Sequence, residues 1–182
     1  MKYMEIYKMS ANTIQSFHLP PYHEIPDVGL YLDQVTRYIN DSLQPLGQPP
    51  VTASMLSNYV KKGYVARPVR KQYFRDQIGY FFFMSLTKQV LPLEHIHTLF
   101  TIQQGSYTAE NAYENFRIRF ESMLASLFNE TKTPVLYPRD ADFGQHMLES
   151  AVISAAHRIY LNYCLDNYPV PTENPAGSPG QS

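Results

Sequence analysis

The chain has 182 residues, and its 15 lysines and arginines against 16 aspartates and glutamates give a formal net charge of −1. This length, with 44% hydrophobic residues, predicts one or two globular domains with a buried core and excludes a wholly disordered chain. A lone cysteine, Cys164, excludes a disulfide framework and a cysteine-rich zinc module. No apolar run is long enough to span a membrane, and the first residues lack the profile of a secretory signal, so we expect a cytoplasmic protein.

Charge is distributed unevenly along this near-neutral chain. Residues 51–90 contain seven basic side chains but only one acidic one, Asp76, which gives this stretch +6 and leaves −7 on the remainder. A segment of this kind can direct a polyanion to one face of a protein whose other faces repel it. Most charged runs are simply solvated surface, so the neighbouring residues must decide between the two interpretations.

The first 26 residues are expected to form an extended lead-in, because prolines 20, 21 and 26 disfavour a helix there. A helix should begin between Asp27 and Leu30 and end at Leu43, since apolar residues recur at helical spacing up to that point. The proline-rich residues 44–50 then form a loop. A short helix follows over residues 52–62, with Thr52 as its N-cap and Gly63 as its left-handed stop.

Residues 64–73 favour β-structure at both ends but are interrupted by Arg67-Pro68, so we expect only a small β wing. The sequence then predicts helices over residues 74–90 and about 92–104, with Pro92 in the first turn of the second and Gly105 closing it. Together, residues 27–105 are predicted to form a head of mainly helical structure.

Two longer helices are predicted over residues 108–130 and 140–167, followed by a disordered tail over 169–182. Apolar residues of the first recur in steps of three and four, the seam of a helix pair: Tyr113, Phe116, Phe120, Met123 and Leu127. We predict that residues 106–168 form an antiparallel pair joined by a short loop. Use of the same seam for a homodimer is an alternative hypothesis.

The short helix over residues 52–62 divides into two faces. Met55, Leu56, Tyr59 and Val60 share one face and should dock on the core. The opposite face carries polar side chains of the types that contact base edges: Ser54, Ser57, Asn58 and Lys61. A helix of about three turns is long enough to enter a major groove. The alternative interpretation is an ordinary amphipathic surface helix.

Basic residues follow this helix closely and are candidates for contacts with phosphate groups, which would set the position of the helix on a duplex. These candidates are Lys62, Arg67, Arg70, Lys71 and Arg75. We expect Tyr64 and Tyr73 to brace the ribbon that carries them. The order of a capped short helix, a glycine stop, a basic ribbon and a buried helix favours DNA contact over a plain basic loop.

Four blocks of this sequence, in this order, resemble the bacterial domain-of-unknown-function 1836 family. The blocks are Leu30–Val35, Met55–Lys62, Pro68–Tyr73 and Lys88–Ile96, and the resemblance covers about residues 19–104. They correspond to a leucine-tyrosine-x-aspartate-glutamine-valine helix, an asparagine-tyrosine-valine-lysine helix and a proline-x-lysine-x-tyrosine turn. The resemblance implies a shared fold for this region but no established activity.

More distantly, residues 52–99 are similar to the winged helix-turn-helix head of MerR-like regulators. In that arrangement a threonine-led helix ending in tyrosine and glycine precedes a basic wing and two further helices. The resemblance implies that residues 54, 57, 58 and 61 lie on a recognition helix and that Arg67, Arg70 and Lys71 lie on the wing. It also implies dimerisation through a helix after the head.

The sequence offers little for catalysis or metal binding. His95 and His97 point to opposite sides of a predicted helix, and His146 and His157 are about 16 Å apart along another, so neither pair can chelate one ion. We therefore expect no enzyme activity, no cofactor and no metal. The predicted function is a DNA-binding transcriptional regulator of all-α fold with a small β wing; the alternative is a non-catalytic protein-interaction module that uses the same basic face.

Overall fold

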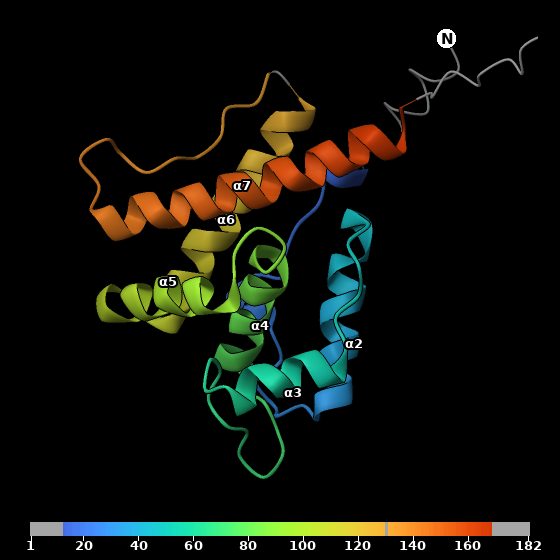
Figure 1. Cartoon of the computed structure of the whole chain (residues 1–182), viewed down its shortest axis with the longest axis vertical. Coiled ribbons are helices and arrows are strands. Elements are labelled where there is room, and N and C mark those ends of the chain that lie inside the picture. Colours follow the sequence, from blue (N-terminus) through green and yellow to red (C-terminus); the bar gives the residue numbers. More distant parts are fainter. Residues whose placement is uncertain (1–12, 130, 169–182) are drawn as a thin grey trace, which may run out of the picture.

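The computed structural model describes residues 13–129 and 131–168. Within them the chain is helical and contains no β-strand, which confirms the all-α prediction (Figure 1). The elements in order are η1 (Tyr22–Glu24), α2 (Leu32–Leu43), η2 (Gln44–Leu46), α3 (Ala53–Lys61), α4 (Arg75–Thr87), α5 (Leu93–Ser106), α6 (Ala109–Phe128) and α7 (Phe143–Asp166). The predicted tail over residues 169–182 lies outside the described residues.

Helix α4 is the centre of the fold. Every residue from Ile78 to Thr87 is buried, and α2, α5, α6 and α7 all pack against this helix (Figure 1). Two hydroxyl groups on it are satisfied locally, because Ser85 and Thr87 donate to the carbonyls four residues earlier at 2.6 and 2.7 Å. A helix that is apolar on all sides requires such neighbours around its whole circumference.

The three consecutive phenylalanines of α4 show how this enclosure works. Phe81 packs on Tyr73 with ring centroids 5.6 Å apart. Phe82 meets Tyr38 of α2 at 5.8 Å, and Phe83 meets Phe116 of α6 edge-on at 5.0 Å. All three side chains are buried within one chain, so none of them is available to contact another subunit.

The helix ends follow the local signals in the sequence closely. Thr52 caps α3 by accepting from the Met55 N–H, and Thr108 caps α6 in the same way. Gly63 has the expected left-handed φ of 77°. Around α5 the prediction differs by one or two residues, since Pro92 is the N-cap and the helix continues through Gly105 to Ser106.

Helices α6 and α7 form the most extensive helix contact of the fold, but the predicted antiparallel direction is wrong. Phe116, early in α6, lines a cavity together with Leu148, early in α7. At the other end Phe128 packs on Tyr160 and Tyr163, both with ring centroids 5.1 Å apart. Like ends of the helices therefore lie together, and the helices cross while running in the same general direction (Figure 1).

The connection between these helices explains the error. The prediction assumed a short loop, whereas residues 131–142 run back alongside the helices before α7 begins (Figure 1). This return is tied down along its length, because the Val135 N–H donates to Ser122 Oγ at 2.9 Å and the Tyr137 N–H donates to Glu149. The Arg119 guanidinium also lies 3.4 Å from the centre of the Tyr137 ring.

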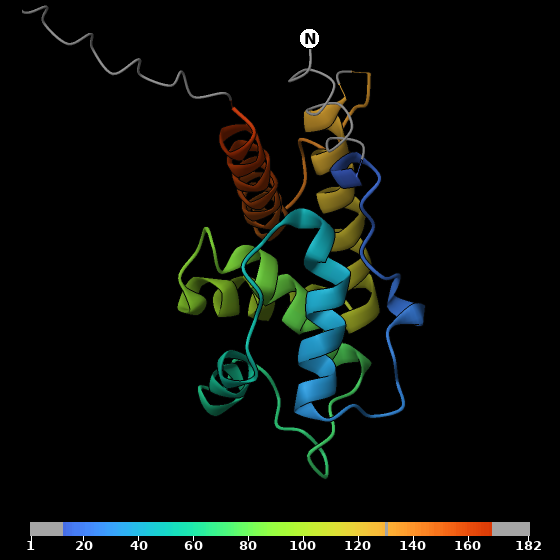
Figure 2. The same cartoon turned by 90° about the vertical axis from the view of Figure 1, so that its right-hand side faces the viewer.

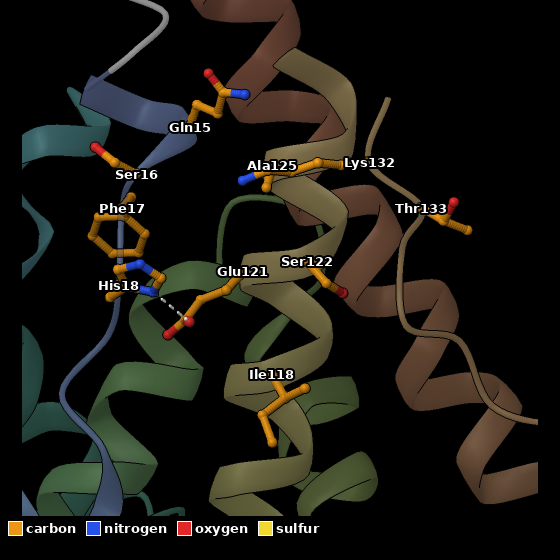
Figure 3. Close-up of a pocket in the computed structure, with 10 residues that line it drawn as sticks. All are labelled: Gln15, Ser16, Phe17, His18, Ile118, Glu121, Ser122, Ala125, Lys132 and Thr133. Carbon is orange, nitrogen blue, oxygen red and sulfur yellow. Dashed lines mark hydrogen bonds and ion pairs between the residues drawn. The ribbon is translucent and has the colours of Figure 1, made fainter. Parts of the chain in front are cut away.

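The lead-in is fastened to α6 by carboxylates. Glu121 accepts from the Leu19 N–H at 2.8 Å. It also accepts from His18 Nδ1 at 2.9 Å, the contact drawn in Figure 3. Glu114 accepts from the Tyr22 N–H at 2.6 Å. Arg117 lies between the two carboxylates, 2.6 Å from Glu114 and 3.2 Å from Glu121, so the three side chains form one charged network under the lead-in.

The predicted β wing is not present as strands among the described residues. In its place are two isolated antiparallel bridges, Val69 with Gln72 and Leu30 with Tyr73. The run is short and Pro68 has no N–H to donate, so a longer ladder cannot form on the incoming arm.

The network on α6 makes a pH-dependent contribution to stability. Burial raises the pKa of Glu114, but hydrogen bonds from Arg117 and from the Tyr22 N–H outweigh this and lower it overall. The native state therefore favours the carboxylate, and this stabilisation is lost as the pH falls through the lowered pKa.

We expect Glu114→Gln to reduce the free energy of unfolding by about 1–2 kcal/mol at neutral pH. Urea unfolding should show the difference shrinking below about pH 4; an equal difference at acidic pH would contradict this assignment.

Candidate nucleic-acid interface

The start of α3 is fixed to α2 by one asparagine. Asn40 of α2 donates through Nδ2 to the Val51 carbonyl and accepts from the Val51 N–H through Oδ1, both at 2.9 Å. The next residue, Thr52, is the N-cap of α3. The direction in which α3 leaves the core is therefore set by two consecutive residues. The backbone of Val51 is hydrogen-bonded to Asn40, and Thr52 caps the helix.

Helix α3 exposes the face that the sequence predicts. Leu56 and Tyr59 are buried at 0% and 3% exposure, while Ser54, Asn58 and Lys61 are exposed and Ser57 is half-buried. The three exposed positions are spaced by four and three residues, which places them on one side of a helix. The predicted polar face is thus open to solvent rather than covered by other segments.

The chain after α3 is held close to the end of that helix. The N–H groups of Tyr64 and Val65 both donate to the Tyr59 carbonyl, at 3.0 and 3.4 Å. Further along, the Gln77 side chain at the start of α4 donates to the carbonyls of Ala66 and Arg67, at 2.9 and 3.3 Å. Both ends of this loop are therefore connected to rigid helices.

A tight turn of residues 69–72, here named the basic turn, forms the tip of the loop. Val69 and Gln72 exchange two backbone hydrogen bonds, of 3.0 and 2.9 Å. The central residues Arg70 and Lys71 have φ of 50° and 66°. Positive φ at both central positions defines a type I′ turn, which normally carries Asn-Gly because other side chains are strained there.

The basic turn stands on a buried base. Tyr73, which is 4% exposed, exchanges two 2.8 Å backbone hydrogen bonds with Leu30 and packs on Phe81. As the sequence predicted, this tyrosine braces the ribbon. The loop that carries the turn projects from the same end of the molecule as α3 in both views (Figures 1 and 2).

The predicted phosphate contacts divide into two groups. Lys62, Arg67, Arg70 and Lys71 are exposed at the end of α3 and on the loop that follows it. Arg75 is instead engaged within the chain.

The Arg75 guanidinium donates to the carbonyls of Ile25 at 2.8 Å and His23 at 3.2 Å. It also lies 5.4 Å from the centre of the Tyr22 ring. These contacts attach the lead-in to the start of α4, so a phosphate would have to compete with carbonyl groups for this side chain.

Lys88 belongs to the basic stretch of the sequence but is half-buried. Its Nζ lies 3.9 Å from Met55 Sδ, beneath α3, and burial lowers the pKa of this ammonium group. The basic stretch therefore presents less charge to solvent than its composition suggests.

Tyr64 does not brace the ribbon as the sequence suggested. Its ring packs on His97 of α5 with centroids 5.1 Å apart, and its hydroxyl donates to Glu94 at 3.2 Å. Asn40 and Gln77, which position α3 and the loop, were missed by the sequence analysis. Gln77 stands at the third position of its helix, where a side chain can reach back to the N-cap backbone, and this spacing was the available signal.

The other features of the structure offer weaker sites. The groove of Figure 3, of about 760 Å³, lies between residues 15–18 and α6, but its carboxylate, Glu121, is already occupied by the lead-in and Arg117. Among residues 13–129 and 131–168, no group of three or more histidines, cysteines or acids could hold a metal ion. Nor is any helix in the described part long and apolar enough to cross a membrane.

Residues 20–116, more than half of the chain, match the family described as Domain of unknown function (DUF1836). The chain belongs to this family. The match confirms the resemblance carried by the four sequence blocks and extends it to the first turns of α6. No curated protein and no solved structure is significantly similar to the chain.

The type I′ geometry of the basic turn leads to a stability prediction. Replacing Arg70 by Asn and Lys71 by Gly should raise the free energy of unfolding by about 1 kcal/mol, because these residues adopt positive φ with less strain. The matched control is the double alanine variant, which removes both charges but keeps the strain and should leave stability nearly unchanged. Denaturant unfolding measures both; a less stable Asn-Gly variant would mean that the native side chains hold the turn.

Proposed function

We propose that this protein binds double-stranded DNA and acts as a transcriptional regulator that performs no chemistry, with α3 in the major groove and the basic turn on the phosphate backbone. The observation that carries the proposal is the basic turn itself. Two cationic side chains occupy positions where the backbone favours Asn-Gly, at the exposed tip of a loop next to α3. Backbone strain of this kind clusters at functional sites.

The open face of α3 supports direct contact with bases. Asn58 has the bidentate geometry that pairs with adenine, Lys61 can donate to guanine, and Ser54 can donate or accept. The helix has nine residues, a length of about 14 Å, which suits a major groove of about 12 Å in width. Ser57 contributes from the edge of this face.

Electrostatics supports the same orientation. No acidic residue occurs between residues 51 and 75. All formal charges that α3 and its loop themselves carry are therefore positive. In this arrangement α3, the basic turn, α4 and α5 correspond in order to a MerR-like winged head, with the bridged turn as a reduced wing. Action on DNA in this way places the protein in the cytoplasm.

A second candidate function is a protein-interaction module that presents the same basic face to an acidic protein. The two differ in their response to nucleic acid. Fluorescence anisotropy with random duplex DNA at two salt concentrations separates them, because DNA binding through phosphates weakens steeply with salt. An absence of binding at low salt would reject the DNA proposal in favour of the interaction module.

The basic turn should account for part of the salt dependence. Changing Arg70 to Asn and Lys71 to Gly keeps the turn but removes two phosphate contacts, so the slope of log K against log salt should flatten by about 2. The matched control changes Lys132 and Arg139, two exposed cations of the return between α6 and α7, to glutamine. The control should leave the slope unchanged; equal effects of both variants would show that only net charge matters.

Asn58 tests base contact separately from phosphate contact. Asn58→Ala should weaken binding to a selected operator by about 1–3 kcal/mol while leaving affinity for random duplex nearly intact. The operator is obtained by selecting bound genomic fragments, and both affinities are measured by anisotropy. An equal loss on both duplexes would place Asn58 among the phosphate contacts and remove α3 from the role of recognition helix.

We infer further that two copies pair through the outward face of α7. The α6 seam suggested for a dimer by the sequence is used within the chain, since Tyr113, Phe116, Phe120 and Met123 are buried. On α7, by contrast, Phe143, Leu161 and Leu165 are exposed at 76%, 56% and 63%.

The exposed residues of α7 allow a symmetric pairing. With a twofold axis at the exposed Ser154, antiparallel pairing would set Phe143 opposite Leu165 and Met147 opposite Leu161. Two charged side chains of α7 are engaged within the chain and not with the proposed pairing face. Glu149 accepts from the Tyr137 N–H, and Arg158 donates to Gln48. A helix-turn-helix reader uses two copies to reach half-sites one helical turn apart.

Light scattering tests the pairing. The full chain should be a dimer at tens of micromolar, and Leu161→Glu should give a folded monomer because it places a charge within the paired face. Leu136→Glu, at a residue 47% exposed outside α7, is the matched control and should remain dimeric. A wild-type monomer would overturn the pairing without affecting the proposed DNA contact.

A further inference from the structure

A small cavity lies where α4, α5 and α6 meet. It has a volume of about 110 Å³, and, apart from Leu148 of α7, its lining residues fall within the part of the chain that matches the family. It is separate from α3 and the basic turn, so the proposed DNA contact does not account for it.

Aromatic rings form the walls of this cavity. Tyr80 of α4 stacks on Phe100 of α5 with ring centroids 3.5 Å apart, and Phe83 meets Phe116 at 5.0 Å. Gly79 lies on the same side, where an added Cβ would come within 3.2 Å of the Tyr113 ring. The cavity therefore offers flat apolar surfaces, of the kind against which another aromatic ring packs face-on or edge-on.

Two polar atoms of the lining residues lack hydrogen-bond partners. Gln103 Oε1 and the Tyr80 hydroxyl are both buried without a partner among the described residues, and each of these side chains is only 5% exposed. Unsatisfied buried polar atoms are rare in folded proteins because desolvating them costs free energy. Burial also raises the pKa of Tyr80, so its hydroxyl stays protonated and able to donate.

The mouth of the cavity is built from the lead-in. The Tyr22 hydroxyl donates to Asp76 across the rim, and the Tyr22 N–H is held by Glu114. Gln104 and Ala109 also line the cavity and are exposed. A ligand would therefore enter beside Tyr22 and meet Gln103 in the interior.

We propose that this cavity binds a small single-ring aromatic molecule that carries an O–H or N–H donor. The ring would pack against Tyr80, Phe83 and Phe116, and the donor would satisfy Gln103 Oε1. The size is consistent, because a dry engineered cavity of about 150 Å³ accepts benzene, and this cavity is somewhat smaller but open at its mouth.

Phenol and benzene are the matched probes, since they differ by one hydroxyl group. Ligand-observed NMR with the full chain should show saturable binding of phenol at least tenfold tighter than that of benzene, as expected for one hydrogen bond to an otherwise unpaired buried acceptor. Gln103→Leu should reduce phenol affinity to the level of benzene. The same variant should be at least as stable as the wild type, because it removes an unsatisfied polar group.

A filled cavity provides the second test. Ala112→Phe should abolish binding of both probes, whereas Ala125→Phe, on the same helix but in the groove of Figure 3, should leave binding unchanged; circular dichroism verifies that both variants fold. Absence of saturable phenol binding to the wild type would overturn the proposal. Unchanged phenol affinity in Gln103→Leu would overturn it equally, and neither outcome bears on DNA binding.

Discussion

The burial of α4 on all sides is the constraint on which the rest of the structure depends. Because Phe81, Phe82 and Phe83 point in three directions, α4 requires the base of the basic turn, α2 and α6 as separate neighbours. The position of the basic turn and its loop also depends on α4. Tyr73 packs on Phe81, and Gln77 at the start of α4 holds the loop through the carbonyls of Ala66 and Arg67. The exposed cations are thus placed by the same helix that fills the core.

Features that depend on near neighbours in the chain were predictable from the sequence. Thr52 and Thr108 cap their helices, and Gly63 takes the left-handed conformation, because each of these roles is decided within a few residues. The relative direction of α6 and α7 was not predictable in this way. It depends on how residues 131–142 return along the helices, and hence on contacts such as that between Arg119 and Tyr137, which no local spacing reveals. The fastening of the lead-in to Glu114 and Glu121 is equally long-range.

The candidate site shows the same division. Its exposed residues on α3 followed from helical periodicity, which the fold preserves. The internal contacts of Arg75 were not predictable, because basic character alone does not show that the carbonyls of His23 and Ile25 lie within reach. The left-handed conformation of Arg70 and Lys71 was also hidden, since the usual Asn-Gly signature of a type I′ turn is absent. Only the β-prone residues on either side of these two positions indicated a ribbon at all.

The two ends of the region that matches the family contact each other in the fold. The Tyr113 hydroxyl donates to the Pro20 carbonyl at 2.7 Å, so the first residue of the matched region contacts a residue near its end at Phe116. Between these points lie α3, the basic turn and nearly all of the aromatic cavity. Residues 20–26 are therefore an integral part of this unit, and their removal would take Tyr22 away from Asp76 and uncover the mouth of the cavity. Helix α7 adds Leu148 to the cavity from inside and keeps its other face outward. Under the proposed function, the matched region provides the contact with DNA and α7 provides the pairing of two such regions.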